Sequence, residues 1–548
     1  MRKFKLLLLF NIALILVGTQ CNAFTRIADL VFDEKPVEPD ELNQVLEIIK
    51  KNKTKNILNK NPAKAKPDEL TTIKAKQKDF ENIQIEIDTS QVIVKSEDDI
   101  QNSISNQGFL NAVQDAIDIW NNSEISKAMF APLKFASGQA NPDDGRNIIS
   151  FRAIETPEGI PDGVAAVSII TIAKTDTVKF MNQIIMVKPG TILDADIIYD
   201  PTNNPCLALE TTTGTITDGG TNAAISEGGI DPTLAPEDLS NCSFIQGGDI
   251  TDLAVRNLGT VLGLESSAIA SSATANNAQI MTRYALTDDD KIGLANIYPN
   301  KENLTNHGIV SGKVILNKKP VSGAHVVLEN LETGTPTAST IADINGKFII
   351  KSIPANTYTI YAEPLDGPIR NNALPRNFFG FTAKNNFVTN VYPKQIKIDK
   401  NKNTRITIEV KELSASAFNI NYFTAALTEE DVNKAGGGFI LPIRIMPGET
   451  LTDVQFWGSN ISPDFGLLTV SGTGITISNI REDKSISIST FSGDPPPDKL
   501  PGIVVDISCD INTTLGPRNI IYTGNQIDPT HPSFGLRDQI SGGIFVVE

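Results

Sequence analysis

Four polar side chains have the spacing of a metal-binding helix and turn, and they lie between Asp249 and Ser267: Arg256, Asn257, Thr260 and Ser266. Positions 256 and 260 are one helical turn apart and therefore share a face. Histidines at that spacing, with a glutamate beside the first, would bind zinc and activate water. Arginine instead stays cationic and repels a metal, asparagine cannot accept a proton at neutral pH, and hydroxyls are poor zinc ligands. The pattern therefore has the spacing of a zinc site without its chemistry.

The frame of this segment resembles the active-site helix and turn of matrixin-like metzincins, zinc peptidases built on H-E-x-x-H-x-x-G-x-x-H. On that motif the three ligand positions hold Arg256, Thr260 and Ser266. The general-base position holds Asn257, and the turn glycine remains as Gly263. The resemblance implies a degenerate α+β peptidase domain, with a mixed sheet plus helices, and we expect no catalytic residue, cofactor or metal in it. The four positions are either ordinary helix-surface and pocket residues or part of a repurposed cleft for a peptide or glycan.

The flanks extend the resemblance over residues 81–299, in the family's order. Apolar residues at helical spacing predict a helix from Phe109 to Trp120, similar to the family's first helix. The segment from Leu286 to Pro299 is similar to the last helix, because Thr287 can cap it and acidic residues fill its first turn.

Strands and a turn complete the comparison with this family. Residues Asn147–Phe151 and Ile192–Tyr199 predict sheet strands, and the second is similar to the family's edge strand before the active helix. Met281 stands where these peptidases carry the methionine turn beneath the metal. The resemblance therefore makes Met281 a candidate for that turn.

No displaced ligand restores the site, because the three histidines, His307, His325 and His531, all follow the domain. His325 falls in an alternating strand, which favours a surface or packing residue over a lone ligand. The Gly/Thr/Asn-rich insert 211–238 contains acidic residues, but it lacks the ordered spacing of a calcium loop. A solvated loop is therefore the favoured interpretation of the insert, and a calcium site is the alternative.

The amino terminus predicts export. Basic residues precede the apolar run Leu6–Val17, and small residues allow cleavage after Ala23, so residues 1–23 are predicted to be a signal peptide. A lipoprotein acylated at Cys21 is the alternative. No later apolar stretch approaches the roughly 20 residues of a membrane span. We therefore expect a secreted, periplasmic or cell-surface protein without a transmembrane span in the mature chain.

Composition narrows the class of protein further. A length of 548 residues suggests three or four domains. The net charge of −16 argues against nucleic-acid binding, which needs a basic surface. Residues 24–80 are rich in lysine and poor in aromatic residues, which predicts a tether or loosely helical spacer without a packed core.

Three cysteines follow the predicted signal peptide. Cys206 and Cys242 bracket the long insert, and a disulfide between them is plausible in an oxidising compartment. Two free thiols are the alternative, because sequence does not fix connectivity. Cys509 is left over and is expected to be buried in a strand.

After residue 299 the chain changes to short strands separated by turns. Residues 307–411 resemble a carboxypeptidase regulatory-like β-sandwich of the transthyretin type, through a G-x-V strand, a P-V-x-G-A turn, a D-x-x-G-x-F hairpin and an I-P-A-x-x-Y return. Asp343 to Gly346 supply the turn residues of that hairpin. Residues 412–548 repeat the strand pattern and predict an immunoglobulin-like sandwich.

Two functions of different classes fit these observations. The favoured one is an exported, non-catalytic protein whose degenerate domain and two β-sandwiches serve binding or surface display, with a protein, peptide or glycan as partner. The alternative is a secreted hydrolase with an unrecognised or remodelled site. For that site the sequence offers acidic residues without a supporting motif: Glu155, Glu158 and Glu265.

Overall fold

The computed structural model describes residues 26–33, 76–88, 106–136, 140–141, 144–151, 164–173, 177–181, 183–188, 190–199, 250–264, 266–275, 286–366, 383–414, 417–424, 442–486, 500–525, 530–531 and 534–547. Several sequence predictions fall outside these residues: the signal peptide with Cys21, the 211–238 insert, Cys206, Cys242, Glu155, Glu158, Glu265 and Met281. Those predictions stay open.

The first unit is built on a mixed seven-stranded sheet in the order β1-β6-β9-β5-β3-β4, with β2 beside β9. Its strands are β1 (Arg26–Asp33), β2 (Lys76–Gln77), β3 (Ile85–Asp88), β4 (Lys134–Phe135), β5 (Asn147–Phe151), β6 (Val164–Ile172) and β9 (Thr191–Tyr199). All neighbouring pairs are parallel except β6 and β9, which are antiparallel. A separate hairpin joins β7 (Thr177–Phe180) to β8 (Gln183–Met186).

Two expectations about this sheet need correction. The strand Ile192–Tyr199 forms, but as β9 it lies between β6 and β5, so it is not an edge strand. The 24–80 segment is not only a tether, because β1 pairs with β6 over eight residues and β2 pairs with β9. The lysine-rich composition did not predict these strand pairings, because strands pair through backbone hydrogen bonds, which do not depend on the side chains.

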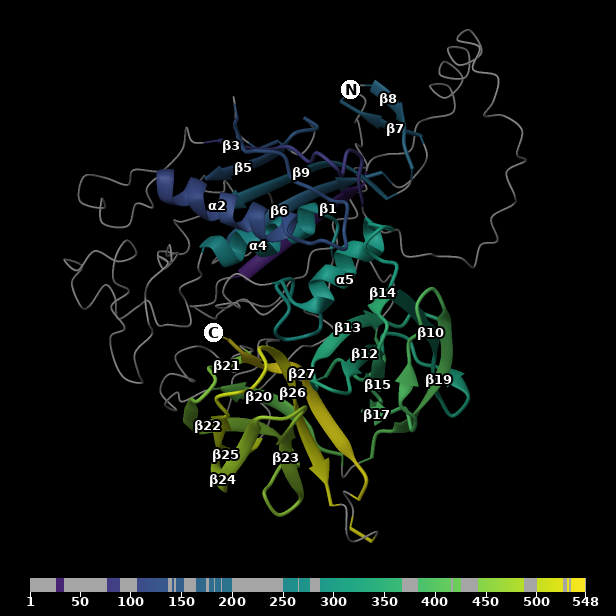
Figure 1. Ribbon diagram of the computed structural model, residues 1–548, viewed down its shortest axis with the longest axis vertical. Helices are drawn as coiled ribbons and strands as arrows, with labels where there is room; N and C mark the ends of the chain where they lie inside the picture. Colours follow the sequence, from purple (N-terminus) through teal and green to yellow (C-terminus); the bar gives the residue numbers. More distant parts are fainter. Residues whose placement is uncertain are drawn as a thin grey trace, which may run out of the picture.

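Two helices of the first unit pack on each other, and the second of them also contacts the sheet. These are α2 (Asn106–Asn121) and α4 (Ile250–Val261), and α4 also contacts β6 and β9 (Figure 1). The predicted apolar face of α2 is buried, and it ends in Trp120, whose indole Nε1–H donates to the Val255 carbonyl at 2.7 Å. The first helix predicted from Phe109 to Trp120 is thereby confirmed.

Helix α5 (Asp288–Ile297) begins at the predicted cap. The Thr287 hydroxyl accepts from the Asp290 N–H, and the Asp290 carboxylate accepts from the Thr287 N–H, which forms a capping box. The three acidic residues of the first turn also interact favourably with the helix dipole. Sequence alone locates this helix because its start signal is local.

The middle unit is a β-sandwich of two five-stranded sheets. One has the order β11-β10-β19-β16 with β14 beside β10, and comprises β10 (His307–Leu316), β11 (Lys319–Pro320), β14 (Lys347–Pro354), β16 (Phe387–Val388) and β19 (Asn403–Glu412). The other has the order β13-β12-β15-β17 with β18 beside β15, and comprises β12 (His325–Asn330), β13 (Pro336–Ile341), β15 (Thr357–Glu363), β17 (Asn390–Val391) and β18 (Ile396–Lys397). The predicted turn also forms: the Asp343 carboxylate accepts from Asn345 N–H and Lys347 N–H at 2.8 Å each, and Gly346 has φ +68°.

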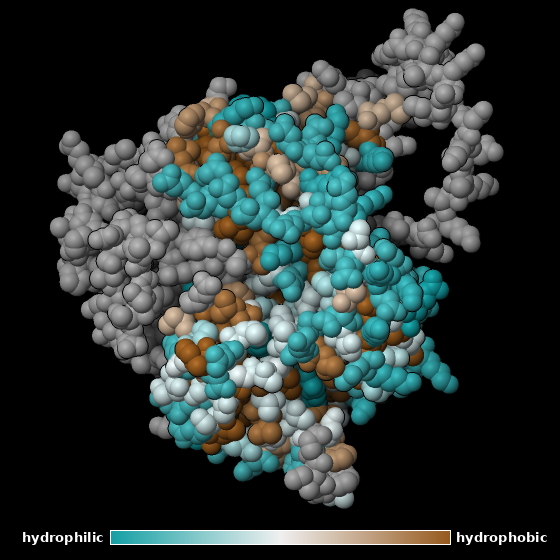
Figure 2. All heavy atoms as spheres, in the orientation of Figure 1, coloured by the Kyte–Doolittle hydropathy of each residue, from teal (hydrophilic) through white to brown (hydrophobic). Residues whose placement is uncertain are grey.

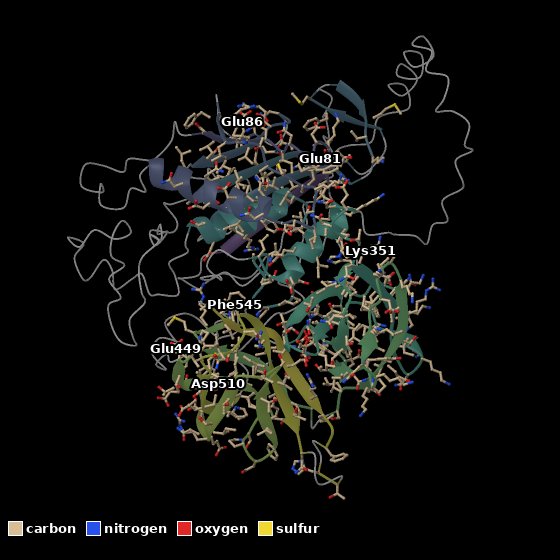
Figure 3. The ribbon with its side chains drawn as sticks, viewed as in Figure 1. Glu81, Glu86, Lys351, Glu449, Asp510 and Phe545 are labelled. Atoms are coloured by element: carbon tan, nitrogen blue, oxygen red, sulfur yellow. The ribbon has the colours of Figure 1, made fainter. Side chains whose placement is uncertain are left out.

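The C-terminal unit is a second sandwich of two four-stranded sheets, β20-β22-β25-β24 and β21-β27-β26-β23. Its strands are β20 (Asn419–Thr424), β21 (Ile443–Ile445), β22 (Thr450–Ser459), β23 (Gly466–Val470), β24 (Ile475–Ile486), β25 (Leu500–Cys509), β26 (Gly516–Gly524) and β27 (Arg537–Val546). Cys509 ends β25 as a buried free thiol, as expected. In Figure 3 Glu449 and Asp510 lie together on one side of this sandwich.

The two sandwiches lie side by side below the first unit, with α5 between them and the first sheet (Figure 1). On the face seen in Figure 2, hydrophilic residues cover much of the middle sandwich, and hydrophobic residues form small separate patches. Within the described part of the chain, no helix combines the length and apolar character that crossing a membrane requires. The described chain is therefore mostly β, with two sandwiches attached to one mixed sheet.

Candidate functional site

Helix α4 carries three of the four predicted site positions, and two of them face the interior. Arg256 is 3% exposed and Asn257 is fully buried, so neither is a helix-surface residue. Thr260 lies one turn after Arg256 and is half-buried, as is Ser266 beyond the helix. The structure therefore buries positions 256 and 257 on α4 and leaves positions 260 and 266 half-buried.

Asn257, at the position of the general base in the metzincin motif, cannot act as a base. The Asn257 Nδ2–H₂ group donates to the Tyr199 hydroxyl at 3.5 Å, which is the outer limit of a hydrogen bond. Burial raises the pKa of Tyr199, so its hydroxyl stays neutral. Asn257 Oδ1 has no hydrogen-bond partner among the described residues. An amide and a neutral phenol cannot take a proton from water at neutral pH.

Zinc does not fit the residues that occupy the motif. A catalytic zinc takes three protein ligands from histidine, cysteine or carboxylate side chains, and positions 256, 260 and 266 hold a cation and two hydroxyls. Among the described residues, no three histidine, cysteine or acidic side chains are placed to hold a metal ion. No step through a metal can be written for this site.

The glycines at 259 and 263 have structural roles in this helix. Gly263 has φ +86°, and its N–H donates to the Thr260 carbonyl at 2.8 Å. The Leu264 N–H donates to the Gly259 carbonyl at 2.9 Å, which completes a Schellman cap at the end of α4. Gly263 therefore ends the helix, and any side chain there would be strained.

Gly259 permits close packing of α4. A Cβ at this position would lie 2.9 Å from both Trp120 Cζ2 and Thr274 Cγ2. The indole of α2 and the loop after α4 both press against the helix at this glycine. Gly263 thus allows the helix to end, and Gly259 allows it to pack closely against α2.

The loop 266–275 after α4 is held by two carboxylates of α5: Asp289 accepts from the Ser267 hydroxyl at 2.6 Å, and the buried Asp290 makes the larger set of bonds. This carboxylate accepts from the Ser272 hydroxyl, from the Ala273 N–H at 3.0 Å, and from the Thr274 N–H and hydroxyl at 3.2 and 3.0 Å. The same side chain closes the capping box of α5. The segment that would present a third zinc ligand in an active peptidase is therefore fixed to α5.

The tip of this loop enters the space between the two sandwiches. Ile269 is fully buried and packs with Val327 of β12 and Tyr361 of β15. Ala268 and Ala270 belong to the core of the C-terminal sandwich. We call this contact the junction: loop 266–275, strands β12 and β15 of the middle sandwich, and strands β26 and β27 of the C-terminal sandwich.

Backbone contacts lock the loop to β27. The Ala270 N–H donates to the Ser541 carbonyl at 2.8 Å. Gly542 has φ +68°, and a Cβ there would lie 2.5 Å from Ser271 Oγ and 2.6 Å from Ile269 Cγ2. The loop and β27 approach so closely that a glycine is required between them.

A buried polar network crosses the junction. The Glu363 Oε1 atom accepts from the Ser541 hydroxyl at 2.7 Å and lies 2.6 Å from His325 Nδ1. The hydroxyls of Tyr361 and Ser541 are 2.9 Å apart, and Asn519 Nδ2 donates to the Tyr361 hydroxyl at 3.1 Å. We call these side chains, with Glu329, the junction cluster. They come from both sandwiches, so the network joins two domains.

Strand β12 contacts the core of the middle sandwich with one face and the junction with the other, because its side chains alternate between the two faces. Val326 and Leu328 point into the core of the middle sandwich, and His325, Val327 and Glu329 point to its other face. That outer face would be solvated in an isolated sandwich, but here the junction covers it. His325 is consequently a packing residue, the role expected from its place in an alternating strand.

The junction cluster is not a hydrolytic triad, although it contains serine, histidine and glutamate. In a triad the histidine contacts the serine and the acid orients the histidine. Here Ser541 and His325 both bind Glu363 Oε1, and all three side chains are buried. The geometry provides a structural hydrogen-bond network and no activated nucleophile.

The first unit contains a buried pair of acidic residues, Asp194 and Asp196, both on strand β9. Asp194 Oδ2 accepts from the Gly145 N–H at 2.6 Å, and Asp196 Oδ1 accepts from the Ile148 N–H at 2.8 Å. Burial and the neighbouring Asp196 raise the pKa of Asp194 to about 8. Each carboxylate fixes a backbone amide, which is a structural use of the pair.

Sequence reasoning did not single out Asp194, Asp290 or Glu363. A signal existed for the first, because acids at alternating positions of an apolar strand point to the same face. Glu363 gave no local signal, since its partners lie 38 and 178 residues away in the chain.

Comparisons with known proteins do not identify a family. No protein-family model matches the sequence. No curated protein matches it either.

The similar solved structures are distant. The major pilin SpaD of Corynebacterium diphtheriae is 8% identical, with 42% of this chain and 64% of that chain covered and a TM-score of 0.15. The minor pilin GBS52 of Streptococcus agalactiae is 14% identical over 20% of this chain and 46% of that chain, with a TM-score of 0.14. A putative carbohydrate binding protein from Bacteroides uniformis is 10% identical over 42% of this chain and 98% of that chain, with a TM-score of 0.13. This chain spans less than two thirds of either pilin, and TM-scores this low do not establish a shared overall fold.

Proposed function

We propose that this protein is an exported, non-catalytic scaffold for binding or surface display, in which a metzincin-like peptidase domain without its zinc site carries two β-sandwich modules. The proposed units are residues 81–299, 307–411 and 412–548, after a signal peptide over 1–23, and strands β1 and β2 of the 24–80 segment complete the sheet of the first unit. The proposed partner is a protein, peptide or glycan at the cell surface.

One observation carries the proposal: the loop 266–275 is used as a structural joint. In the proposed ancestral site this loop would hold the third zinc ligand next to open cleft. Here Asp290 fixes its backbone and Ile269 is buried between the sandwiches. Because this loop is fixed by hydrogen bonds and buried between the sandwiches, it supports a scaffold role over a catalytic one.

The sheet and helices give further support to the metzincin-like part. The mixed sheet, the Schellman cap at Gly263 and the capping box of α5 occur in the order that the resemblance implies. The Cys206–Cys242 disulfide and the methionine turn at Met281 remain part of the proposal. Intact-mass analysis of unreduced protein tests the disulfide.

Zinc binding by a designed variant tests the proposed ancestry. Arg256→His, Asn257→Glu, Thr260→His and Ser266→His together should restore a three-ligand site, and zinc should bind at least about a hundredfold more tightly than to the parent. A matched control keeps Ser266 and carries only the other three changes, so it has two ligands and should bind more weakly. A folded four-residue variant with the parent's zinc affinity would show that the positions do not converge.

Activity measurements on the unmodified protein test the non-catalytic part. Purified mature protein should contain no stoichiometric zinc and should not cleave casein in a chelator-sensitive way, because the motif offers no ligand. Elemental analysis that finds one zinc per chain, removed by EDTA with loss of cleavage, would overturn this part of the proposal.

A further inference from the structure

The two sandwiches form a stack of four β-sheets. The sheet of β10, β14 and β19 is one end of the stack, at the right of Figure 1, and the sheet of β22, β24 and β25 is the other end, at the left. The two inner sheets meet at the junction, where Tyr361 of β15 contacts Asn519 of β26 and Ser541 of β27. The outward faces of the two end sheets therefore point away from each other within one chain.

The outward face of β10, β14 and β19 is rich in cations. On β14, Phe348 and Ile350 lie in the core of the middle sandwich, so the residues that alternate with them point outward, and these are exposed. The same alternation on β10 and β19 gives an outward set of five cations and one acid in the described residues: Lys313, Lys347, Lys351, Arg405, Lys411 and Glu409. We call this surface the basic face.

The cations of the basic face lie close together without counter-charges. Lys313 and Lys347 are directly opposite in the antiparallel pair of β10 and β14, and like charges at that spacing repel each other. Arg405 lies one strand further, opposite Ser311. In the part of the chain that the structure describes, Lys313, Lys347 and Arg405 have no ion-pair partner. A surface of opposite charge would relieve this repulsion.

The opposite end of the stack carries the complementary charge. Asp506 points outward from β25, and its Oδ1 accepts from the Asp453 N–H of β22 at 3.2 Å. Arg481 of β24 is the one described cation among these acids, and it pairs with Asp453. Figure 3 shows two more acids on this side of the C-terminal sandwich, Glu449 and Asp510. We call Glu449, Asp453, Asp506 and Asp510 the acidic face.

Each of the two faces also exposes a large apolar side chain among its charges. Ile349 is 47% exposed and lies between Lys347 and Lys351 on β14. Ile511 is 72% exposed, follows Asp510, and its Cδ1 lies 3.2 Å from the place of a Cβ at Gly448. An apolar centre with a charged or polar rim is typical of a protein–protein interface. The basic and acidic faces therefore match in both charge and apolar character.

We propose that copies of this chain associate head to tail, with the basic face of one copy on the acidic face of the next. Because the two faces lie at opposite ends of the stack, the contact is heterologous and leaves a free face at each end for a further copy. Salt screens the repulsion between copies of net charge −16 beyond about 8 Å, so the charges within the contact decide whether it forms. Under the proposed display role, on which this step rests, the protein partner is a second copy of the chain.

Reversing the charge of one face at a time tests the association in the full mature chain. The basic-face variant is Lys347→Glu with Lys351→Glu, and the acidic-face variant is Asp510→Lys with Ile511→Lys. Sedimentation velocity from about 1 to about 100 μM should show that the native protein associates as its concentration rises. This association should be weaker at about 1 M salt than at about 0.15 M.

The two variants together distinguish head-to-tail contact from other modes of association. Each variant alone should associate at least about tenfold more weakly than the native protein, because every contact then includes one reversed face. An equimolar mixture should associate again, because the unchanged acidic face of one variant meets the unchanged basic face of the other.

Several outcomes overturn the proposal: a native protein that stays monomeric throughout, a variant that associates like the native protein, or a mixture that stays monomeric. The matched control is Lys394→Glu with Lys400→Glu, which makes the same change in net charge at exposed lysines outside the basic face. It must associate like the native protein, and an equal loss there would assign the effect to net charge.

A milder variant keeps the test open if the basic-face variant does not fold by circular dichroism. Lys313→Gln with Lys347→Gln then takes its place, and it must weaken association by at least about threefold, because it removes two attractions without adding repulsion. None of these measurements involves zinc, so their failure is distinguishable from failure of the zinc and proteolysis tests of the proposed function.

Discussion

Helix α4 and the junction cluster both contain buried polar side chains, but these side chains make hydrogen bonds of different quality. On α4, Asn257 has one contact of 3.5 Å, to the Tyr199 hydroxyl. In the junction cluster, Glu363 Oε1 binds His325 Nδ1 and Ser541 Oγ at 2.6 and 2.7 Å, whereas Glu363 Oε2 and His325 Nε2 have no hydrogen-bond partner among the described residues. A buried polar group without good partners costs stability, and one within a network stabilises a specific arrangement.

This difference indicates where the chain depends on polar chemistry. Position 257 on α4 holds a buried amide whose Oδ1 has no hydrogen-bond partner among the described residues. The junction needs its polar groups, because they set how two sandwiches and a loop meet. The predictions below test this contrast, from the largest expected effect to the smallest.

The contrast is sharpest for Glu363 and Asn257. Glu363→Ala leaves His325 and Ser541 buried without their common acceptor, and it should lower the free energy of unfolding by about 3–5 kcal/mol. Asn257→Leu replaces a poorly bonded amide with an apolar group of similar size, and it should change stability by less than about 1 kcal/mol. Urea unfolding of both variants measures the difference. Equal losses would mean that the two regions do not differ in this way.

A pH titration extends the contrast to the first unit. The raised pKa of Asp194, about 8, means that its contribution to stability is complete below about pH 4 and is lost as the pH rises toward 8. The slope is at most about 1.4 kcal/mol for each pH unit. Thermal unfolding between pH 6 and pH 8 should show falling stability in the native protein and a flatter profile in Asp194→Asn. An unchanged profile in the variant would assign the slope to other groups.

Close packing at the junction is tested by two glycines of the same backbone conformation. Gly542 and Gly535 both have φ +68°, but only Gly542 has neighbours within 4 Å of an added Cβ. Both alanine variants carry the backbone strain, and Gly542→Ala also meets Ser271 and Ile269. It should therefore be less stable than Gly535→Ala by about 1–3 kcal/mol. If calorimetry finds the two variants equal, the loop does not press on β27.

Two helical glycines, Gly259 in α4 and Gly293 in α5, allow a similar comparison of a closely packed position with a less crowded one. Gly259→Ala places a Cβ 2.9 Å from Trp120 and Thr274, and it should cost about 1–2 kcal/mol through overpacking, after a gain of about 1 kcal/mol in helix propensity. Gly293→Ala in α5 meets only the end of the Leu264 side chain, at 3.2 Å, and should be close to neutral. Chemical denaturation of both variants checks this. A stabilised Gly259→Ala variant would show that α2 and α4 are less closely packed than described.

Several elements were predictable because their signals are local. Helices α2 and α5 follow from apolar spacing and from the Thr287 cap, and the strands of both sandwiches follow from alternation and turn residues. The turn at Gly263 was also predictable, because its φ of +86° is a conformation that favours glycine. By contrast, the interior position of β9 and the pairing of β1 with β6 involve partners far apart in the chain, which no local pattern reports.

The sequence by itself determined that positions 256, 257, 260 and 266 cannot form a zinc site, because side-chain chemistry does not depend on the fold. Only the tertiary structure decided what the loop after these positions contacts. Ile269, Glu363 and Ser541 meet because strands and a loop from three units converge, and their partners are separated by up to 178 residues. Burial at such a meeting point also sets the pKa of Asp289, since desolvation and neighbouring charges exist only after the chain has folded.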